Sequence, residues 1–214
     1  MFSLSEKILQ SNAFISGQST GYADLVPTDT VDMISVTLQP HGAKAFFAMP
    51  ISELFEKTVP LGDLSDPALN ELQDRLMNTP DTAMCVQLIE IFLLKRLQIT
   101  KDYNYRRMTA VLNAIHYGQA NVDNLAQTSC LGYKQFKRIF AEYAGINPKD
   151  FVRIVRFQRA LFIWQHQPGI SFTHLAYESG FCDQSHLIKE FITFSGYTPS
   201  EYKAVCAPYS DYFS

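Results

Sequence analysis

LAQTSCLGYKQFKRIFAEYAGINPKDFVRIVRFQRAL (residues 125–161) and LAYESGFCDQSHLIKEFITFSGYTPSEY (residues 175–202) are two versions of one pattern, and this internal repeat decides the fold. Matching positions lie 50 residues apart before the turn of each unit and 51 apart after it, so the second turn holds one additional residue. The matched positions are Leu125, Ala126, Ser129, Phe136, Phe140, Gly145, Pro148 and Phe151 in the first unit, and Leu175, Ala176, Ser179, Leu187, Phe191, Gly196, Pro199 and Tyr202 in the second. Each unit predicts a short helix, a tight turn and a longer helix, the arrangement of a helix-turn-helix motif.

The longer helix of each unit has one apolar face, which predicts which of its positions are outward. The apolar positions, spaced three or four residues apart, are Phe136, Ile139, Phe140 and Tyr143 in the first unit and Leu187, Phe191 and Phe194 in the second. The outward positions are Lys134, Lys137 and Arg138 in the first unit and Gln184, Ser185, Ile188 and Lys189 in the second. Lysine and arginine can recognise guanine, glutamine can recognise adenine, and isoleucine can contact a thymine methyl group. We therefore expect these seven residues to contact base edges in the major groove.

The helix boundaries of the two units are marked by capping residues. Asn147 and Thr198 each precede a proline, which suits the first position of a helix. Glu201 completes a capping box with Thr198, and Asp183 is placed to cap the second recognition helix. Gly145 and Gly196 stand where the preceding helices need a left-handed end. The local signals therefore agree with the repeat.

Residues 149–166, between the units, predict one continuous helix. At 1.5 Å per residue such a helix spans roughly 27 Å. It can hold two recognition helices about one DNA turn apart, roughly 34 Å, so that both enter successive major grooves on one face of the duplex. Three arginines of this helix, Arg153, Arg156 and Arg159, either contact phosphates or only coat the helix, and the sequence leaves both interpretations open.

The N-terminal half has a different pattern. Residues 12–49 predict strands in AFISG, VDMISVTLQ and AKAFFAM, with a turn at Pro40–Gly42. Helices are predicted near 51–57, 66–78 and 81–98. The last of them is apolar on too many sides for a lone surface helix, so we expect it to pack in a core or in a dimer interface.

Charge separates the two halves of the 214-residue chain, whose net charge is −3. Residues 1–99 carry 6 basic and 12 acidic side chains, whereas residues 100–206 carry 12 basic and 8 acidic ones. The basic half is therefore the candidate DNA-binding half.

We expect a cytoplasmic protein, because the sequence shows no targeting signal and its cysteines are widely spaced. No apolar run reaches the length of a membrane span, and the N-terminal residues lack the features of a signal peptide. The four cysteines are widely spaced and do not form a secreted disulfide framework, so we expect reduced and mostly buried thiols. A cytoplasmic protein with no membrane partner is expected.

The sequence contains no pattern of residues that supports catalysis or metal binding. Cys182 and His186 have a metal-compatible spacing, but no second pair accompanies them. No nucleophile is paired with a general base. We expect no enzymatic activity, no catalytic residues, no metal site and no cofactor.

The repeat, with its Gly-Phe, Asp-Gln-Ser-His, Phe, Gly and Thr-Pro-x-x-Tyr in register, resembles the AraC/XylS family of bacterial regulators over about residues 104–204. The resemblance implies a double helix-turn-helix domain whose base contacts fall on the seven outward positions given above. Two positions depart from the family pattern: Cys130 stands where many members have glycine, and Gly132 where many have a serine cap.

The N-terminal stretches ISGQSTGYADL and LQPHGAKAFFAMP, leading into PISEL and VPLGDL, are similar to the later half of a β-rich sensor domain of some members of that family. The resemblance implies a small-molecule effector, although the β region is short for a closed barrel. The predicted fold class is mainly α, with an all-α DNA-binding domain in which a long helix joins two helix-turn-helix units. The predicted domains are a partial β-rich sensor-like region (1–62), linker or dimerisation helices (63–100), the double helix-turn-helix domain (101–206) and a tail (207–214).

Two functions are compatible with the sequence. The first is a sequence-specific transcription regulator that binds double-stranded DNA, with RNA polymerase, a small-molecule effector and a second copy of the chain as further expected partners. The second is a protein-interaction module that keeps the helix-turn-helix fold and has lost DNA binding. Salt-sensitive DNA binding separates the two, because only the first requires release of counterions from phosphates.

Overall fold

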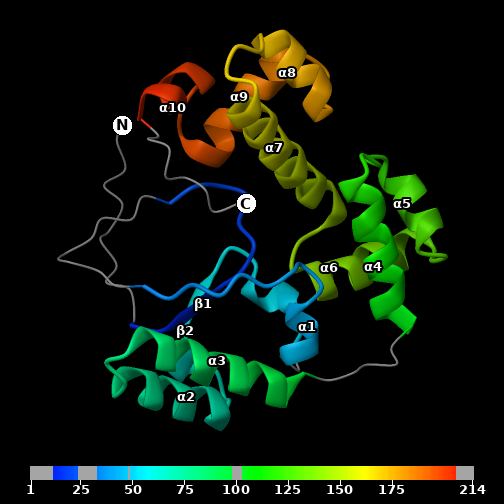
Figure 1. Cartoon of the computed structure of the whole chain (residues 1–214). Coiled ribbons are helices and arrows are strands. Elements are labelled where there is room, and N and C mark those ends of the chain that lie inside the picture. The colour runs from blue at the N-terminus through cyan, green and yellow to red at the C-terminus, as the bar shows by residue number, and fades with distance from the viewer. Residues whose placement is uncertain (1–11, 24–32, 48, 98–102, 206–214) are drawn as a thin grey trace, which may run out of the picture.

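The computed structural model describes residues 12–23, 33–47, 49–97 and 103–205, and within them the chain is mainly helical with one small antiparallel sheet (Figure 1). This confirms the predicted fold class. The strands and short 3-10 helices of the N-terminal half are β1 (Phe14–Ser16), η1 (Ile51–Leu54), β2 (Thr58–Pro60) and η2 (Leu61–Asp63). The helices are α1 (Ala43–Phe46), α2 (Pro67–Met77), α3 (Thr82–Arg96), α4 (Tyr103–His116), α5 (Val122–Thr128), α6 (Tyr133–Ala144), α7 (Pro148–His166), α8 (Phe172–Ser179), α9 (Gln184–Ser195) and α10 (Pro199–Val205).

The first helix-turn-helix unit consists of α5 and α6 and packs with α4 around its own core. Phe136 and Phe140 on α6 are fully buried, and their rings lie edge to face with centroids 5.7 Å apart. Phe140 also contacts Phe151 at the start of α7, 5.5 Å between centroids. The apolar face predicted for this helix is therefore the buried face.

The second unit, α8 and α9, packs on the later half of α7 around a separate core. Leu187 and Phe191 of α9 are fully buried, and Phe191 lies edge to face with Trp164 of α7. Phe194 is only partly buried and stacks on Phe157, 5.2 Å between centroids. Both cores include residues of α7, so this helix is the shared scaffold of the two units.

Capping residues mark the starts and ends of the helices at the predicted places. The side chain of Asn147 accepts a hydrogen bond from the backbone N–H of Asp150 (3.1 Å), and Thr198 and Glu201 form the predicted capping box. Gly145 and Gly196 end α6 and α9 with φ of 80° and 77°, the left-handed region where a side chain is strained. The repeat therefore extends to the backbone conformation of each helix end.

Cys130 occupies the left-handed position that Gly180 occupies in the second unit. Its φ is 54°, against 83° for Gly180. A residue with a Cβ is strained in this region, whereas glycine is not. We expect Cys130→Gly to raise the free energy of unfolding by about 1 kcal/mol in urea titrations. Cys130→Ala is the control, because it removes the thiol and keeps the Cβ. Equal stability of the two variants would contradict the strain.

The sheet differs from the prediction for residues 12–49. Only β1 forms there, and its antiparallel partner is β2, with Ile15 opposite Val59. Residues 33–39 form no strand, and residues 43–46 form α1 instead of the predicted strand; Val31 and Asp32 lie outside the described residues. Alternating apolar residues make a strand only where a partner edge is available, and β1 pairs with β2. The turn at Pro40–Gly42 is confirmed by the hydrogen bond from the N–H of Gly42 to the carbonyl of Gln39 (2.7 Å).

Helices α2 and α3 confirm the two longer helices predicted in the N-terminal half, whereas the one predicted near 51–57 is the 3-10 helix η1. No helix of the described residues is long and apolar enough to cross a membrane. Cys85 of α3 is buried, but Cys130 and Cys182 are exposed, so the expectation of mostly buried thiols is wrong; Cys206 lies outside the described residues. The exposed pair lies at the turns of the helix-turn-helix units, where the chain runs over the surface.

Candidate nucleic-acid interface

Helix α6 presents a row of cations on the side opposite its buried face. Lys134, Lys137 and Arg138 are all exposed, as the spacing predicts. Within the described ranges, no carboxylate forms an ion pair with any of them. The row therefore offers unneutralised positive charge and hydrogen-bond donors to a ligand.

Tyr133 extends this row and was missed at the level of sequence. It begins α6, it is about half exposed, and the ammonium of Lys137 lies 5.6 Å from the centre of its ring. A cation over an aromatic ring at this distance is held by the ring quadrupole. The signal available in the sequence was the spacing of four residues, which places the two side chains on one face of a helix.

Helix α9 begins at a firmly capped end. The carboxylate of Asp183 accepts a hydrogen bond from the backbone N–H of His186 (2.7 Å), as predicted. The corresponding residue before α6 is Gly132, which has no capping side chain. The start of the second recognition helix is therefore held by a contact that the first one lacks.

Thr173 of α8 fixes the side chain of Gln184, the first residue of α9. Its hydroxyl donates to the Gln184 side-chain carbonyl at 2.9 Å, which leaves the amide N–H groups free to donate outward. This contact joins the two helices of the second unit. Sequence reasoning did not find Thr173, because the contact depends on how α8 and α9 cross.

The remaining predicted positions of α9 differ among themselves. Ser185 and Lys189 are exposed, whereas Ile188 is half-buried. The second unit therefore offers one cation and several uncharged groups, and the first offers three cations. The two units are unequal in charge.

Two of the three arginines of the connecting helix are held by the protein itself. Arg153 forms ion pairs with Asp150 (2.9 Å) and with Glu190 of α9 (3.0 Å). Arg159 donates to the backbone carbonyl of His116 at 2.7 Å. Arg156 has no hydrogen bond or ion pair to another described residue, which distinguishes it from the other two.

Cys182 and His186 have no further metal-binding side chains placed beside them among the described residues. The ring of His186 lies edge to face with Phe181, 5.2 Å between centroids, and its Nε2 is 3.7 Å from a carboxylate oxygen of Glu190. Among the described residues, no group of three histidine, cysteine, aspartate or glutamate side chains is placed to hold a metal ion. The histidine therefore has local contacts that account for its position.

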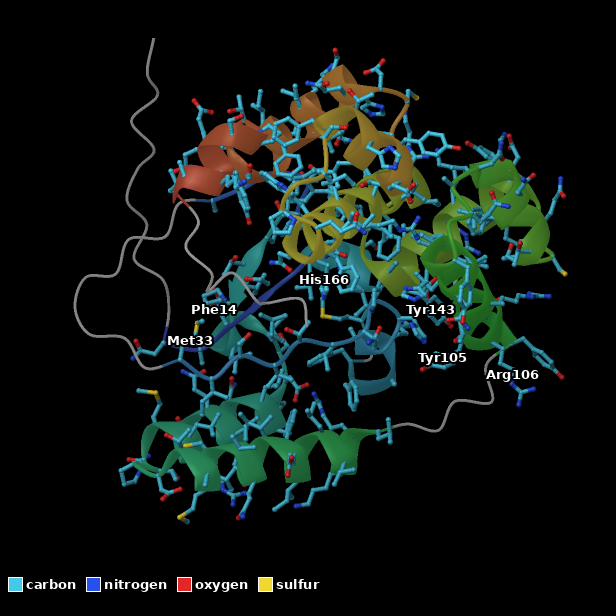
Figure 2. The ribbon with its side chains drawn as sticks, turned by 45° about the horizontal axis from the view of Figure 1, so that its top comes forward. Phe14, Met33, Tyr105, Arg106, Tyr143 and His166 are labelled. Carbon is cyan, nitrogen blue, oxygen red and sulfur yellow. The ribbon has the colours of Figure 1, made fainter. Side chains whose placement is uncertain are left out.

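The C-terminal ends of both recognition helices lie against the N-terminal region (Figures 1 and 2). A Cβ at Gly145 would approach Ile51 Cγ2 to 3.0 Å and Gln18 Cγ to 3.7 Å. At the equivalent position of the second unit, a Cβ at Gly196 would approach the ring of Tyr22 to 2.7 Å. Lys44 of α1 also pairs with Glu142 of α6 at 3.4 Å. Residues 18–22 thus touch both units.

Comparison with known families and proteins gives two family matches. Residues 125–204 match a family described as a helix-turn-helix domain. Residues 1–60 match a family described as a domain of unknown function, DUF6597. The first match covers the repeat and the second covers the N-terminal region.

Two curated relatives are similar to the chain. The Msm operon regulatory protein of Streptococcus mutans is 23% identical over 155 residues, which are 71% of this chain and 55% of the relative. An uncharacterized HTH-type transcriptional regulator of Haemophilus influenzae is 24% identical over 156 residues, 72% of this chain and 52% of the relative. The chain thus spans about half the length of these relatives. No solved structure matches it.

Proposed function

We propose that this chain is a transcription regulator of the AraC type and that it binds a specific DNA site through both units at once, which its helix-turn-helix match and its similarity to two regulators support. Helices α6 and α9 enter successive major grooves on one face of the duplex, with α7 as the spacer. Lys134, Lys137, Arg138, Gln184, Ser185, Ile188 and Lys189 contact the base edges. We propose that the linker helices span residues 63–100 and that the DNA-binding domain spans residues 101–206.

The observation that carries this proposal is the state of the outward cations. Lys134, Lys137, Arg138 and Lys189 are exposed on equivalent helices, and none is neutralised by a carboxylate of the described part of the chain. The charge of Arg153, by contrast, is neutralised by an ion pair with Glu190. Free cations on the recognition helices suit a polyanionic ligand, and Gln184, oriented by Thr173, suits readout of a base.

Selection of bound duplexes from a random pool tests the proposal. We expect one enriched sequence, a footprint that spans two successive major grooves, and affinity that falls steeply with salt. A pool that stays random, with DNA binding absent or insensitive to salt, would instead support a protein-interaction module.

We further propose that the N-terminal region controls the relative positions of the two recognition helices. Gln18 and Tyr22, four residues apart, lie at Gly145 and Gly196, the equivalent ends of α6 and α9. The segment is anchored by the hydrogen bond from the N–H of Glu56 to the carbonyl of Gln18 (2.9 Å). A small-molecule effector that moves this segment would act on both units together, which requires that it bind the two arrangements with different affinity.

Tyr22→Ala tests this coupling. We expect affinity for a full two-groove site to change by about threefold to tenfold, in the range of ordinary coupling energies, while affinity for a half-site stays constant. The measurement is fluorescence anisotropy with full and half sites. Tyr103→Ala is the control, because Tyr103 is exposed at the start of α4. An equal effect of both variants would contradict the coupling.

We also propose that α3 pairs with α3 of a second copy of the chain. Ile91 and Leu94 are exposed on one face of α3, and Leu94 is 71% exposed. Exposed apolar side chains on one face of a helix suit contact with a second helix. In an antiparallel pair centred between Ile91 and Leu94, Glu90 of each copy faces Lys95 of the other, so the surface is complementary to itself.

Leu94→Glu is expected to raise the dimer dissociation constant by at least about tenfold, because it buries an unpaired carboxylate at the centre of the pair. Analytical ultracentrifugation over a concentration series measures it. Met77→Glu is the control, since Met77 is exposed on α2 outside the proposed face. A monomeric chain, or equal effects of both variants, would overturn the proposed dimer.

A further inference from the structure

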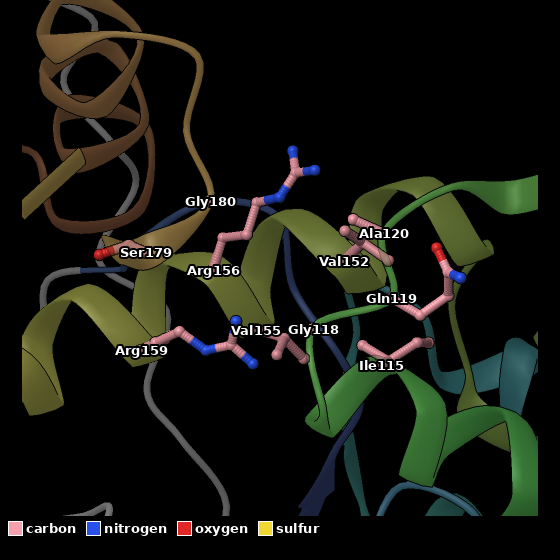
Figure 3. A pocket seen from close by; sticks show the side chains of 10 residues that line it. All are labelled: Ile115, Gly118, Gln119, Ala120, Val152, Val155, Arg156, Arg159, Ser179 and Gly180. Carbon is pink, nitrogen blue, oxygen red and sulfur yellow. The ribbon is translucent and has the colours of Figure 1, made fainter. Parts of the chain in front are cut away.

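A pocket of about 230 Å³ lies on α7, between the loop that follows α4 and the end of α8 (Figure 3). Its walls come from three parts of the chain. Gly118 to Ala120 follow α4 and precede the first unit, Ser179 and Gly180 end the first helix of the second unit, and α7 runs between them. A molecule that fills this pocket would contact the connecting helix, the second unit and the loop that leads from α4 into the first unit.

The pocket is lined by both aliphatic and cationic side chains. Ile115, Val152 and Val155 supply aliphatic surface, and the guanidinium groups of Arg156 and Arg159 supply the charge (Figure 3). No carboxylate is present among the residues that line it. The positive charge in the pocket is therefore not neutralised from within.

The two arginines differ in how they are held. The Nη2 of Arg159 donates to the carbonyl of His116, so this side chain is fixed and keeps its other N–H groups for a ligand. Arg156 has no partner in the part of the chain that the structure describes. Both guanidiniums lie against glycine backbone: a Cβ at Gly118 would be 3.6 Å from Arg159 Nη1, and one at Gly180 would be 3.6 Å from Arg156 Nε.

We propose that this pocket binds a small organic carboxylate, with its carboxylate on the guanidinium of Arg156 and its apolar body on the aliphatic side chains. Arginine binds carboxylates through two parallel hydrogen bonds, and few convergent polar groups in an apolar pocket are typical of a small-molecule site. The volume equals that of about eight water molecules, which suits a ligand of roughly ten non-hydrogen atoms. A DNA phosphate fits less well, because it would use the arginine and leave the aliphatic side chains uncovered.

Such a ligand would stabilise one arrangement of the two recognition helices, because it joins the second unit to the loop that leads into the first. This consequence rests on the proposed DNA-binding function, whereas the binding itself does not. The site is separate from the contacts of residues 18–22 with Gly145 and Gly196. It would give the DNA-binding domain a ligand response of its own.

Calorimetric titration of the full chain with phenylacetate, in the absence of DNA, tests the site. We expect saturable one-to-one binding, and at least tenfold weaker binding of phenylacetamide, which has the same shape without the charge. Arg156→Gln should weaken phenylacetate binding by at least tenfold. The matched control is Arg106→Gln, an exposed arginine of α4 outside the pocket, and it should bind as the wild type does.

Several results would overturn the proposal. Equal binding of phenylacetate and phenylacetamide would show that the site does not recognise the negative charge. Equal effects of the two arginine variants would show that phenylacetate does not bind in this pocket. Absence of saturable binding at millimolar phenylacetate would show that there is no such site. Inorganic phosphate is titrated in parallel, and binding of phosphate but not phenylacetate would identify a contact for DNA phosphates instead. Affinity for the selected duplex is then compared with and without phenylacetate, and a change is expected. Because the calorimetry contains no DNA, failure to select any duplex would leave its result unaffected.

Discussion

Replacing Arg138 by alanine is expected to weaken binding to the selected duplex by about 10- to 100-fold and to relax base preference at one position. Arg138 lies on the outward face of α6, opposite the fully buried Phe136 and Phe140. No carboxylate of the described residues competes for its guanidinium, so its donors are available for the two acceptors of a guanine. The measurement is anisotropy titration against the selected duplex and against single-base variants of it.

Arg106→Ala separates a base contact from a general effect of charge. It removes the same charge from an exposed position of α4. If Arg138→Ala and Arg106→Ala have equal effects on affinity and on preference, then Arg138 does not contact a base. A loss of affinity without a change of preference would assign it to a phosphate instead.

The unequal charge of the two units predicts how salt acts. Removing the cations of α6 should reduce the slope of affinity against salt concentration more than removing Lys189 of α9, because three cations in a groove displace more counterions than one does. The sequence alone predicts this difference, and the exposure of all four cations is consistent with it.

The double helix-turn-helix could be predicted in detail because its signals are local. Phe136 and Phe140 repeat at the spacing of a helix face, and Asn147, Asp183 and Gly196 act within a few residues of their own positions. The left-handed conformation of Cys130 was not predicted, although its alignment with Gly180 is the signal that could have found it. Periodicity and capping therefore suffice where each helix is defined by its own sequence.

The N-terminal half could not be predicted to the same extent because its structure depends on distant partners. The strand Phe14–Ser16 pairs with Thr58–Pro60, more than forty residues away, and the hydrophobic pattern of residues 33–39 finds no such partner. Among the site residues, Thr173 was missed for the same reason, since its contact with Gln184 is set by the crossing of two helices. Arg153 was left undecided because its partner, Glu190, lies 37 residues away.

Replacing Arg153 by methionine is expected to lower the free energy of unfolding by about 3 kcal/mol, the lower end of the effect of removing one partner of a buried ion pair, because Arg153 is 27% exposed. The Nε of Arg153 lies 3.1 Å from both carboxylate oxygens of Glu190, whose side chain is only 7% exposed. The hydrogen bond to Glu190 raises the pKa of Arg153, so the guanidinium stays protonated. Without the arginine, a carboxylate is left without its ion-pair partner between α7 and α9.

The double variant Arg153→Met with Glu190→Leu is expected to recover most of the lost stability, because apolar side chains of similar size can replace a buried ion pair without a large cost. Trp164, the single tryptophan of the chain, lies in the second core against Phe191 and reports unfolding by fluorescence in urea. Arg156→Met is the matched control, three residues along the same helix at an arginine without a partner among the described residues, and it should change stability by less than about 0.5 kcal/mol. Recovery in the double variant would locate the cost in the unpaired carboxylate. Equal instability of the single and double variants would show that Arg153 acts through its contact with the ring of Phe194 or its ion pair with Asp150, and not through Glu190.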